Sequence, residues 1–97
     1  MTKSNSIQSY PHCKEIWDAA YASQGSIFVQ PRNMSQSELV GDLLHYRMLV
    51  RKENSKFYPP GHPEHMTSIF DPFKITKVNG GIRIRRRQPA DYEIVEE

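Results

Sequence analysis

The chain has 97 residues and a formal net charge of +2, with 37% hydrophobic and 25% charged residues. This size fits a single domain with one modest core. No apolar run approaches the about 20 residues of a membrane-spanning helix, so we expect no membrane partner. Residues 1–9 are polar and lack the apolar stretch of a signal peptide, and a lone cysteine, Cys13, is typical of a reducing compartment. These features predict a cytoplasmic protein.

Charge is distributed unevenly along the chain. Residues 32–87 carry eleven Lys and Arg against five Asp and Glu, whereas the charged side chains of residues 88–97 are all acidic. A basic body with an acidic tail indicates an anionic partner, or a tail that shields the basic surface; the alternative is a solvated surface with charges of both signs. We expect residues 1–9 to be disordered, residues 10–88 to form one domain, and residues 89–97 to be an acidic tail or an edge strand.

A helix is predicted over residues 11–23. Pro11 suits the first helical position, where its missing N–H costs nothing, and Gly25 is a natural stop. Strand-forming residues at 27–29, followed by Pro31, predict a short and largely buried strand over 26–30. In the predicted 11–23 helix, apolar residues recur at three- and four-residue spacing and so form one face: Cys13, Ile16, Trp17 and Ala20.

A second helix is predicted from residue 36 to about residue 53. Ser35 and Glu38 match a capping box, in which the serine hydroxyl accepts the Glu38 N–H and the glutamate reaches back. Met34 and Leu39 are placed to form the matching hydrophobic staple. The predicted core stripe contains Leu39, Leu43, Tyr46 and Val50, widened on one side by Val40 and Leu44.

Residues 54–72 are expected to form a long connection with prolines at positions 59, 60, 63 and 72. Loops of this length inside compact domains are uncommon and are often functional. The alternative is a proline-stiffened strap that is packed by its own apolar side chains, namely Phe57, Tyr58, Met66, Ile69 and Phe70.

A β-hairpin is predicted over residues 73–87. Asn79-Gly80 favours a type I′ turn, which needs positive φ at both central positions. In that register Val78 faces Gly81, and strand alternation separates two faces. The inward face gathers Phe73, Ile75, Ile82 and Ile84, and the other face gathers Lys74, Thr76, Val78, Arg83, Arg85 and Arg87.

Residues that could support catalysis or metal binding are sparse. His62 and His65 supply only two of the three or four ligands that zinc needs. Cys13 falls on the predicted apolar helix face, where a thiol is usually an inert core residue. No glycine-rich loop precedes a helix in the way that phosphate-cradling motifs require. We therefore expect no enzyme activity, no cofactor and no metal.

Two groups of basic residues are the candidate binding residues. Arg47 and Arg51 lie beside the apolar stripe of the second helix, and Lys52 follows on its exposed side. The two arginines either form salt bridges or meet an anionic partner. The second group lies on one face of the hairpin, where a two-stranded ribbon could enter a DNA major groove or where charge could protect an edge strand from aggregation: Lys74, Arg83, Arg85 and Arg87.

The order of predicted elements indicates an α+β fold, with two helices, a short strand and a C-terminal hairpin (α-β-α-β-β). This order loosely resembles that of winged-helix domains, in which a basic hairpin forms the wing, but the 36–53 segment lacks the turn that precedes a recognition helix. We expect a small nucleic-acid-binding or regulatory domain that uses the hairpin and the second helix. The alternative is a protein-interaction module that binds an acidic surface, such as a small inhibitor or adaptor of the kind that phages encode. A homo-oligomer is compatible with either function.

Overall fold

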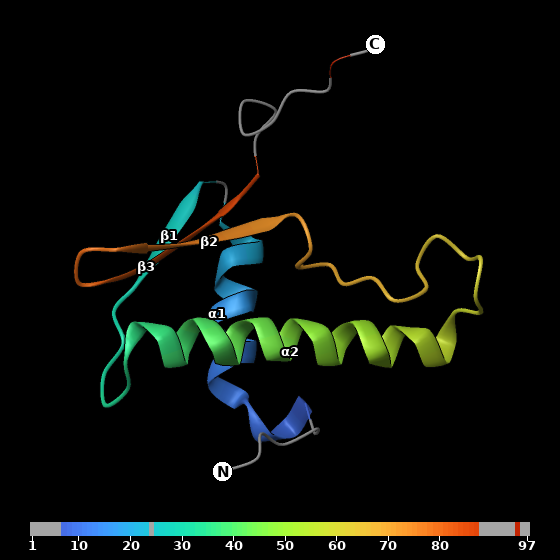
Figure 1. Ribbon diagram of the computed structural model, residues 1–97, viewed down its shortest axis with the longest axis horizontal. Helices are drawn as coiled ribbons and strands as arrows, with labels where there is room; N and C mark the ends of the chain where they lie inside the picture. Colours follow the sequence, from blue (N-terminus) through green and yellow to red (C-terminus); the bar gives the residue numbers. More distant parts are fainter. Residues whose placement is uncertain (1–6, 24, 88–94, 96–97) are drawn as a thin grey trace.

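The α+β class is confirmed by a computed structural model, which describes residues 7–23, 25–87 and 95. Two helices and a three-stranded antiparallel sheet make up the fold (Figure 1). No helix in the described part of the chain is long and apolar enough to span a membrane. The elements in chain order are the 3-10 helix η1 (Ile7–Ser9), α1 (Pro11–Ala22), β1 (Ser26–Val29), α2 (Gln36–Phe57), β2 (Phe73–Val78) and β3 (Gly81–Arg86).

The third strand of the sheet is β1, and the strand order is β1-β3-β2. β1 pairs with β3 in antiparallel register, with Ser26 opposite Arg85 and Val29 opposite Ile82. The central strand is therefore β3, and the hairpin is not a free two-stranded ribbon. The suggested third strand from the tail lies in residues 89–97, which, apart from Val95, are outside the described residues.

The predicted hairpin register is confirmed. Val78 faces Gly81, Ile75 faces Ile84 and Phe73 faces Arg86. The turn type, however, differs from the prediction, because φ is positive at Gly80 (+85°) but not at Asn79. That pattern belongs to a type II turn, which needs positive φ only at its second central residue.

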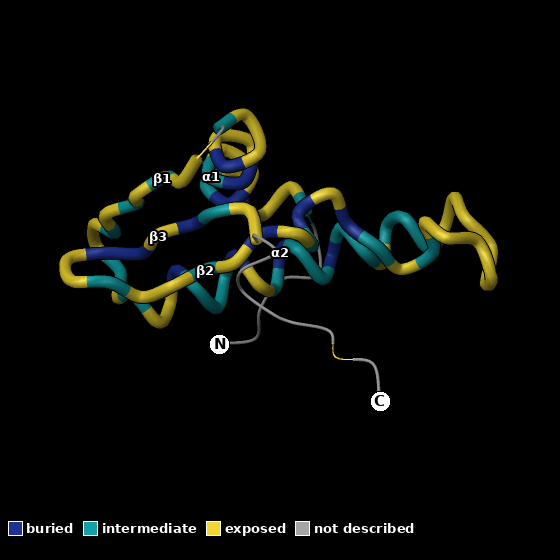
Figure 2. Tube along the Cα trace, turned by 90° about the horizontal axis from the view of Figure 1, so that it is seen from above, coloured by how far each residue is buried: buried dark blue, intermediate teal, exposed yellow. Residues whose placement is uncertain are grey.

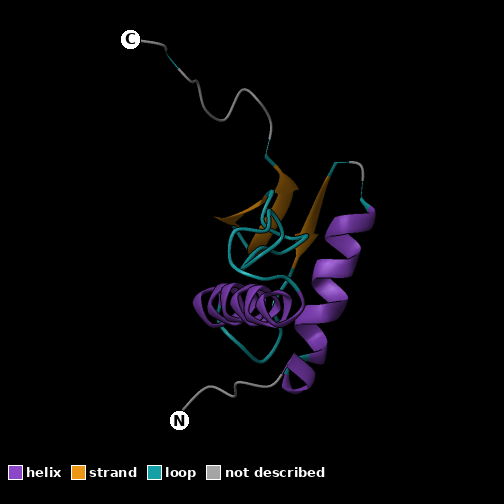
Figure 3. Cartoon of the chain, turned by 90° about the vertical axis from the view of Figure 1, so that its right-hand side faces the viewer, coloured by secondary structure: helices purple, strands orange, loops and turns teal. Residues whose placement is uncertain are grey.

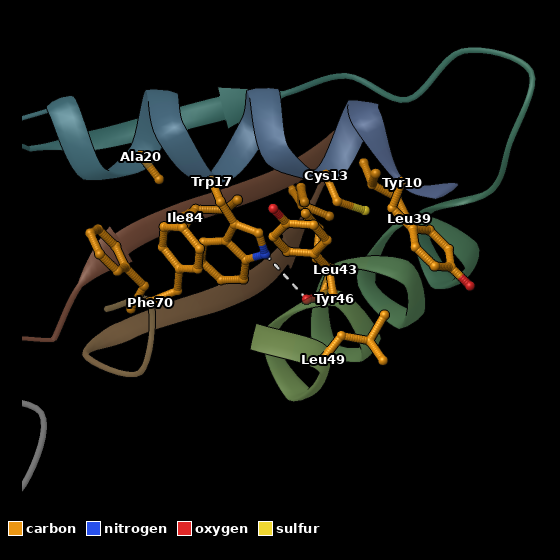
Figure 4. Close-up of a cluster of buried hydrophobic side chains, with 12 residues drawn as sticks. Tyr10, Cys13, Trp17, Ala20, Leu39, Leu43, Tyr46, Leu49, Phe70 and Ile84 are labelled. Atoms are coloured by element: carbon orange, nitrogen blue, oxygen red, sulfur yellow. Dashed lines mark hydrogen bonds between the residues drawn. The ribbon is translucent and has the colours of Figure 1, made fainter. Parts of the chain in front are cut away.

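Both helices lie on the same side of the sheet (Figure 3). Trp17 from α1 is fully buried at the centre of the core, and its indole N–H donates to the carbonyl oxygen of Leu43 at 3.2 Å (Figure 4). The Trp17 ring stacks on Phe70, with ring centroids 5.1 Å apart, and meets the edge of Phe73 at 6.1 Å. Ile82 and Ile84 close the core from the sheet.

The start of α2 is confirmed, because the Ser35 hydroxyl accepts the Glu38 N–H at 3.1 Å. The predicted end at residue 53 is wrong, since α2 continues to Phe57 and stops only before the Pro59-Pro60 pair. The core stripe is also turned slightly from the predicted one. Leu49 is buried in place of Val50, and Leu44 is 43% exposed, because the helix presents the Leu39, Leu43, Tyr46 and Leu49 side to α1 and the sheet.

Two further expectations need correction. Residues 7–9 were assigned to the disordered N-terminus, but they form η1, and Ile7 packs against the core. β1 was expected to be largely buried, yet its side chains alternate between exposed and half-buried because it is an edge strand of the sheet. In addition, α2 is one continuous helix, which is the departure from winged-helix domains that the sequence already indicates.

A candidate nucleic-acid interface on the open face of the sheet

The face of the sheet that points away from the helices collects most of the candidate residues. Strand register places Phe28 opposite Arg83, which in turn lies opposite Thr76. One step along the strands, Ser26, Arg85 and Lys74 form a second row on the same face. Arg87 follows β3 with the alternation that places it on this face. We call this surface the open face, and it consists of Ser26, Phe28, Lys74, Thr76, Arg83, Arg85 and Arg87.

The open face is basic and accessible. Lys74, Thr76, Arg83 and Arg87 are exposed, and Arg85 is half-buried. Its members include four basic side chains and no carboxylate. The chemistry that this arrangement offers is attraction of a polyanion by several cations that are held on one rigid sheet.

Phe28 is a member of the open face that sequence analysis missed. Its side chain is 51% exposed although it is a large aromatic. The ring occupies the space above Gly81, since a Cβ atom at position 81 would lie 3.0 Å from the ring Cζ. Because residues 27–29 are all apolar, the sequence shows no alternation of polar and apolar residues that would tell which of them face outward. Only the pairing of β1 with β3 shows that Phe28 points outward.

Two other basic residues near the sheet have structural contacts on its covered side. The Arg86 guanidinium lies over the Phe73 ring, 4.7 Å from its centroid, and 5.8 Å from the ring centroid of Tyr21. The Lys77 ammonium donates to the Ser37 hydroxyl at 2.9 Å and so links β2 to α2. The basic side chains of the open face therefore come from every second residue of the hairpin strands, as the register predicts, and the basic residues between them face the covered side.

The candidate residues of the second helix are separate from the open face, because α2 lies on the covered side of the sheet (Figure 3). Arg47 donates to the Phe73 carbonyl oxygen at 3.3 Å and to that of Phe70 at 3.5 Å. Burial, and secondarily the nearby charge of Arg51, lowers the pKa of the Arg47 guanidinium. Arg47 thus anchors the chain that enters β2, and Lys52 is exposed on α2.

Arg51 completes the anchoring of the loop that follows α2. It binds the Asp71 carboxylate at 2.8 Å, and the other Asp71 oxygen accepts the Ser68 N–H at 3.0 Å. Asn54 donates to the Thr67 carbonyl oxygen at 2.7 Å. These bonds fix the returning part of the loop against α2, which agrees with the salt-bridge alternative for Arg51.

The histidine and cysteine residues do not form a recognisable chemical site. His12 Nε2 lies 3.3 Å from an Asp42 carboxylate oxygen and 3.4 Å from the Cys13 sulfur. A nucleophile, base and carboxylate arrangement uses both imidazole nitrogens, whereas here one nitrogen faces both neighbours. Cys13 is also fully buried. Within residues 7–23 and 25–87, no three His, Cys, Asp or Glu side chains are grouped to hold a metal ion.

Comparison of the chain with models of protein families, with characterised proteins and with solved structures gives no match. The functional argument therefore rests on the residues of the open face themselves.

Proposed function

We propose that this protein is a nucleic-acid-binding domain that contacts its ligand through the open face and acts in the cytoplasm. The observation that supports this proposal is the combination of Lys74, Arg83, Arg85 and Arg87 on the sheet face that points away from both helices, where residues 7–23 and 25–87 place no carboxylate among the residues of the open face. Lysine and arginine are the residues that neutralise phosphates, and their contacts release counterions. The sheet supplies the rigidity, because β3 is paired on both sides.

The contribution of α2 to this function is smaller than the sequence suggests. Arg47 and Arg51 already bind carbonyl and carboxylate oxygens of the loop that leads into β2. Removing them would disturb the fold before it disturbed a ligand. Mutations that test binding belong on the open face for that reason.

The test is the salt dependence of binding to a labelled oligonucleotide. Replacing Arg83 and Arg85 together by alanine should lower the affinity and reduce the slope of log K against log salt by up to about two units. The matched control removes two exposed lysines elsewhere, with Lys14→Ala and Lys56→Ala, and leaves the open face intact. A chain that binds no nucleic acid at low salt, or a control that weakens binding equally, contradicts the proposal.

The second candidate function is protein interaction through the projecting end of α2 and its loop. We call residues 57–69 the distal arm, which extends beyond the sheet and is largely exposed (Figures 1 and 2). Phe57 is 73% exposed and Ile69 is 56% exposed, so the strap interpretation of this loop holds for Phe70 but not for these residues. Large apolar side chains that are exposed on one projecting segment are candidates for a protein-contact surface.

The two candidate functions are distinguished by comparing variants of the two surfaces, for oligonucleotide binding and for binding of a protein partner. Phe57→Ser combined with Ile69→Ser changes the distal arm and leaves the open face untouched. If the protein binds nucleic acid, this variant keeps the affinity of the original chain. If it instead recruits a protein through the distal arm, the variant loses that partner while the variant that lacks Arg83 and Arg85 retains it.

A further inference from the structure

We infer that the open face takes a single-stranded nucleic acid, with a base stacked on Phe28 and the neighbouring phosphates held by Arg83, Lys74 and Arg87. This inference rests on the proposed function and names the form of its ligand. It depends on three observations: the exposed ring of Phe28, the glycine beneath that ring, and the basic side chains beside it.

The first observation is that Phe28 is exposed, although the other face of the same sheet packs on the hydrophobic core. Its neighbours Ile27 and Val29 are half-buried on the covered side, whereas the Phe28 side chain remains 51% exposed on the open face. An aromatic ring on the surface of an antiparallel sheet is the feature on which single-stranded RNA and DNA bases stack in several unrelated domains. Such stacking tolerates any base, because every base has an aromatic face.

The second observation is that the Phe28 ring packs over the glycines at positions 80 and 81. A side chain at position 81 would overlap the Val29 carbonyl oxygen and meet the Phe28 ring at 3.0 and 3.1 Å from two of its atoms. A Cβ atom at Gly80 would also come within 4.0 Å of the ring. The two glycines that begin β3 and close the turn thus leave room for the ring against the sheet. A ring held in this way loses little conformational freedom when a base stacks on it.

The third observation is the position of the charges relative to the ring. Arg83 lies directly opposite Phe28 on the adjacent strand, and such cross-strand neighbours have Cα atoms about 5 Å apart. Lys74 and Arg87 extend the positive charge along the strands, and Thr76 lies beside Arg83 without adding charge. A nucleotide with an unstacked base presents both a flat ring and a phosphate, so it can use the aromatic ring and the basic side chains of the open face at once.

A duplex matches the open face less well. Its bases are stacked on one another, so their faces are not available to Phe28. The major groove admits a two-stranded ribbon, but β1 adds a third strand beside the hairpin. A duplex would therefore contact the basic side chains through its phosphates and leave the aromatic ring unused.

The experiment compares four labelled ligands at low salt: oligothymidylate, oligouridylate, an abasic oligomer of the same length, and a duplex. The original chain should bind oligothymidylate about tenfold more tightly than the abasic oligomer. Phe28→Ala should remove this preference and leave the affinity for the abasic oligomer unchanged, while Phe28→Tyr should retain it. Phe57→Ala is the matched control, because Phe57 is an exposed phenylalanine on the distal arm.

The outcomes separate this inference from the function on which it rests. If none of the four ligands binds, both the proposed function and this inference are wrong. If all four bind equally well and Phe28→Ala has no effect, the protein binds nucleic acid through phosphates alone, and only the stacking inference is wrong. Binding of oligothymidylate or oligouridylate that is tighter than binding of both the abasic oligomer and the duplex supports the inference. The tighter of the two single strands then assigns the natural ligand to DNA or to RNA. Because Phe28 is half-exposed, circular dichroism should show Phe28→Ala to be folded.

Discussion

The ring of Phe28 in β1 fills the space that a side chain at Gly81 in β3 would occupy. Two of its carbon atoms come within 3.0 and 3.1 Å of the position that a Cβ atom would take at residue 81. A glycine at position 81 is therefore needed for space rather than for an unusual backbone angle, because its φ is not in the left-handed region. The position of the exposed Phe28 ring therefore depends on the pairing of β1, an edge strand, with β3, the central strand.

Gly81→Ala should destabilise the protein by about 1–3 kcal/mol, the usual cost of forcing extra volume into a packed site. The added methyl group overlaps the Val29 carbonyl oxygen, so β1 must move away from β3. Urea unfolding measures the loss. Gly25→Ala is the control, since nothing lies within 4 Å of a Cβ atom there and the change should be nearly neutral. Equal stability of the two variants would contradict the packing of Phe28 on Gly81.

Ser35→Ala should cost about 1 kcal/mol, because the Glu38 N–H at the start of α2 loses its hydrogen-bond acceptor. Ser35→Asp should preserve the stability, since aspartate caps helices as well as serine does. Thermal unfolding followed by circular dichroism compares the two variants. An alanine variant as stable as the original chain would show that the N-terminus of α2 does not need this cap.

Phe70→Ala should be the most damaging change in the loop, with a loss of about 3–5 kcal/mol. Phe70 is buried and stacks on Trp17 with ring centroids 5.1 Å apart, and the Tyr46 ring centroid lies 6.4 Å from that of Phe70. Tryptophan fluorescence reports directly on this site. Ile69→Ala is the control, because that side chain is 56% exposed and its removal should change the stability by less than about 0.5 kcal/mol. Similar losses for both variants would show that the loop is not anchored through Phe70.

Deleting residues 91–97 should strengthen binding of oligonucleotides at low salt. The deletion removes four carboxylates, at positions 91, 93, 96 and 97, and these charges compete with phosphates for the basic side chains of the open face. The gain should shrink as salt rises, because screening weakens both interactions. A full-length variant with the four acids changed to their amides should reproduce the effect if charge is its cause. Unchanged or weaker binding by both variants would contradict competition by the tail.

Local patterns in the sequence predict much of this fold. The Asn79-Gly80 pair predicts the position of the turn and hence the hairpin register, and the cap at Ser35 predicts where α2 begins. The turn type was harder to predict, because an Asn-Gly pair is compatible with more than one turn and the flanking strands decide between them. The end of α2 was also misplaced, since Asn54 is helical when its side chain finds a partner in the Thr67 carbonyl oxygen.

The features that sequence patterns miss are those that depend on distant contacts. Nothing near Phe28 indicates that β1 pairs with β3, and so its outward direction could not be predicted from residues 26–30 alone. The partners of Arg47 are main-chain carbonyl oxygens, which have no sequence signature. The candidate site was therefore only half predicted: its charges follow from strand alternation, but its aromatic centre follows from topology.

The placement of β3 has a consequence for biosynthesis. β3 is the last of the described elements along the chain, yet Ser26 pairs with Arg85 and Gln36 donates to the carbonyl oxygens on both sides of the turn, Val78 and Gly81. A nascent polypeptide cannot complete its sheet or bury Trp17 until this segment has left the ribosome. Pairing between such distant segments is slow and leaves apolar surface exposed in the meantime. The sheet therefore forms only after residues 81–86 have been synthesised, and a chain that stops before residue 81 lacks the central strand on which β1 and β2 pair.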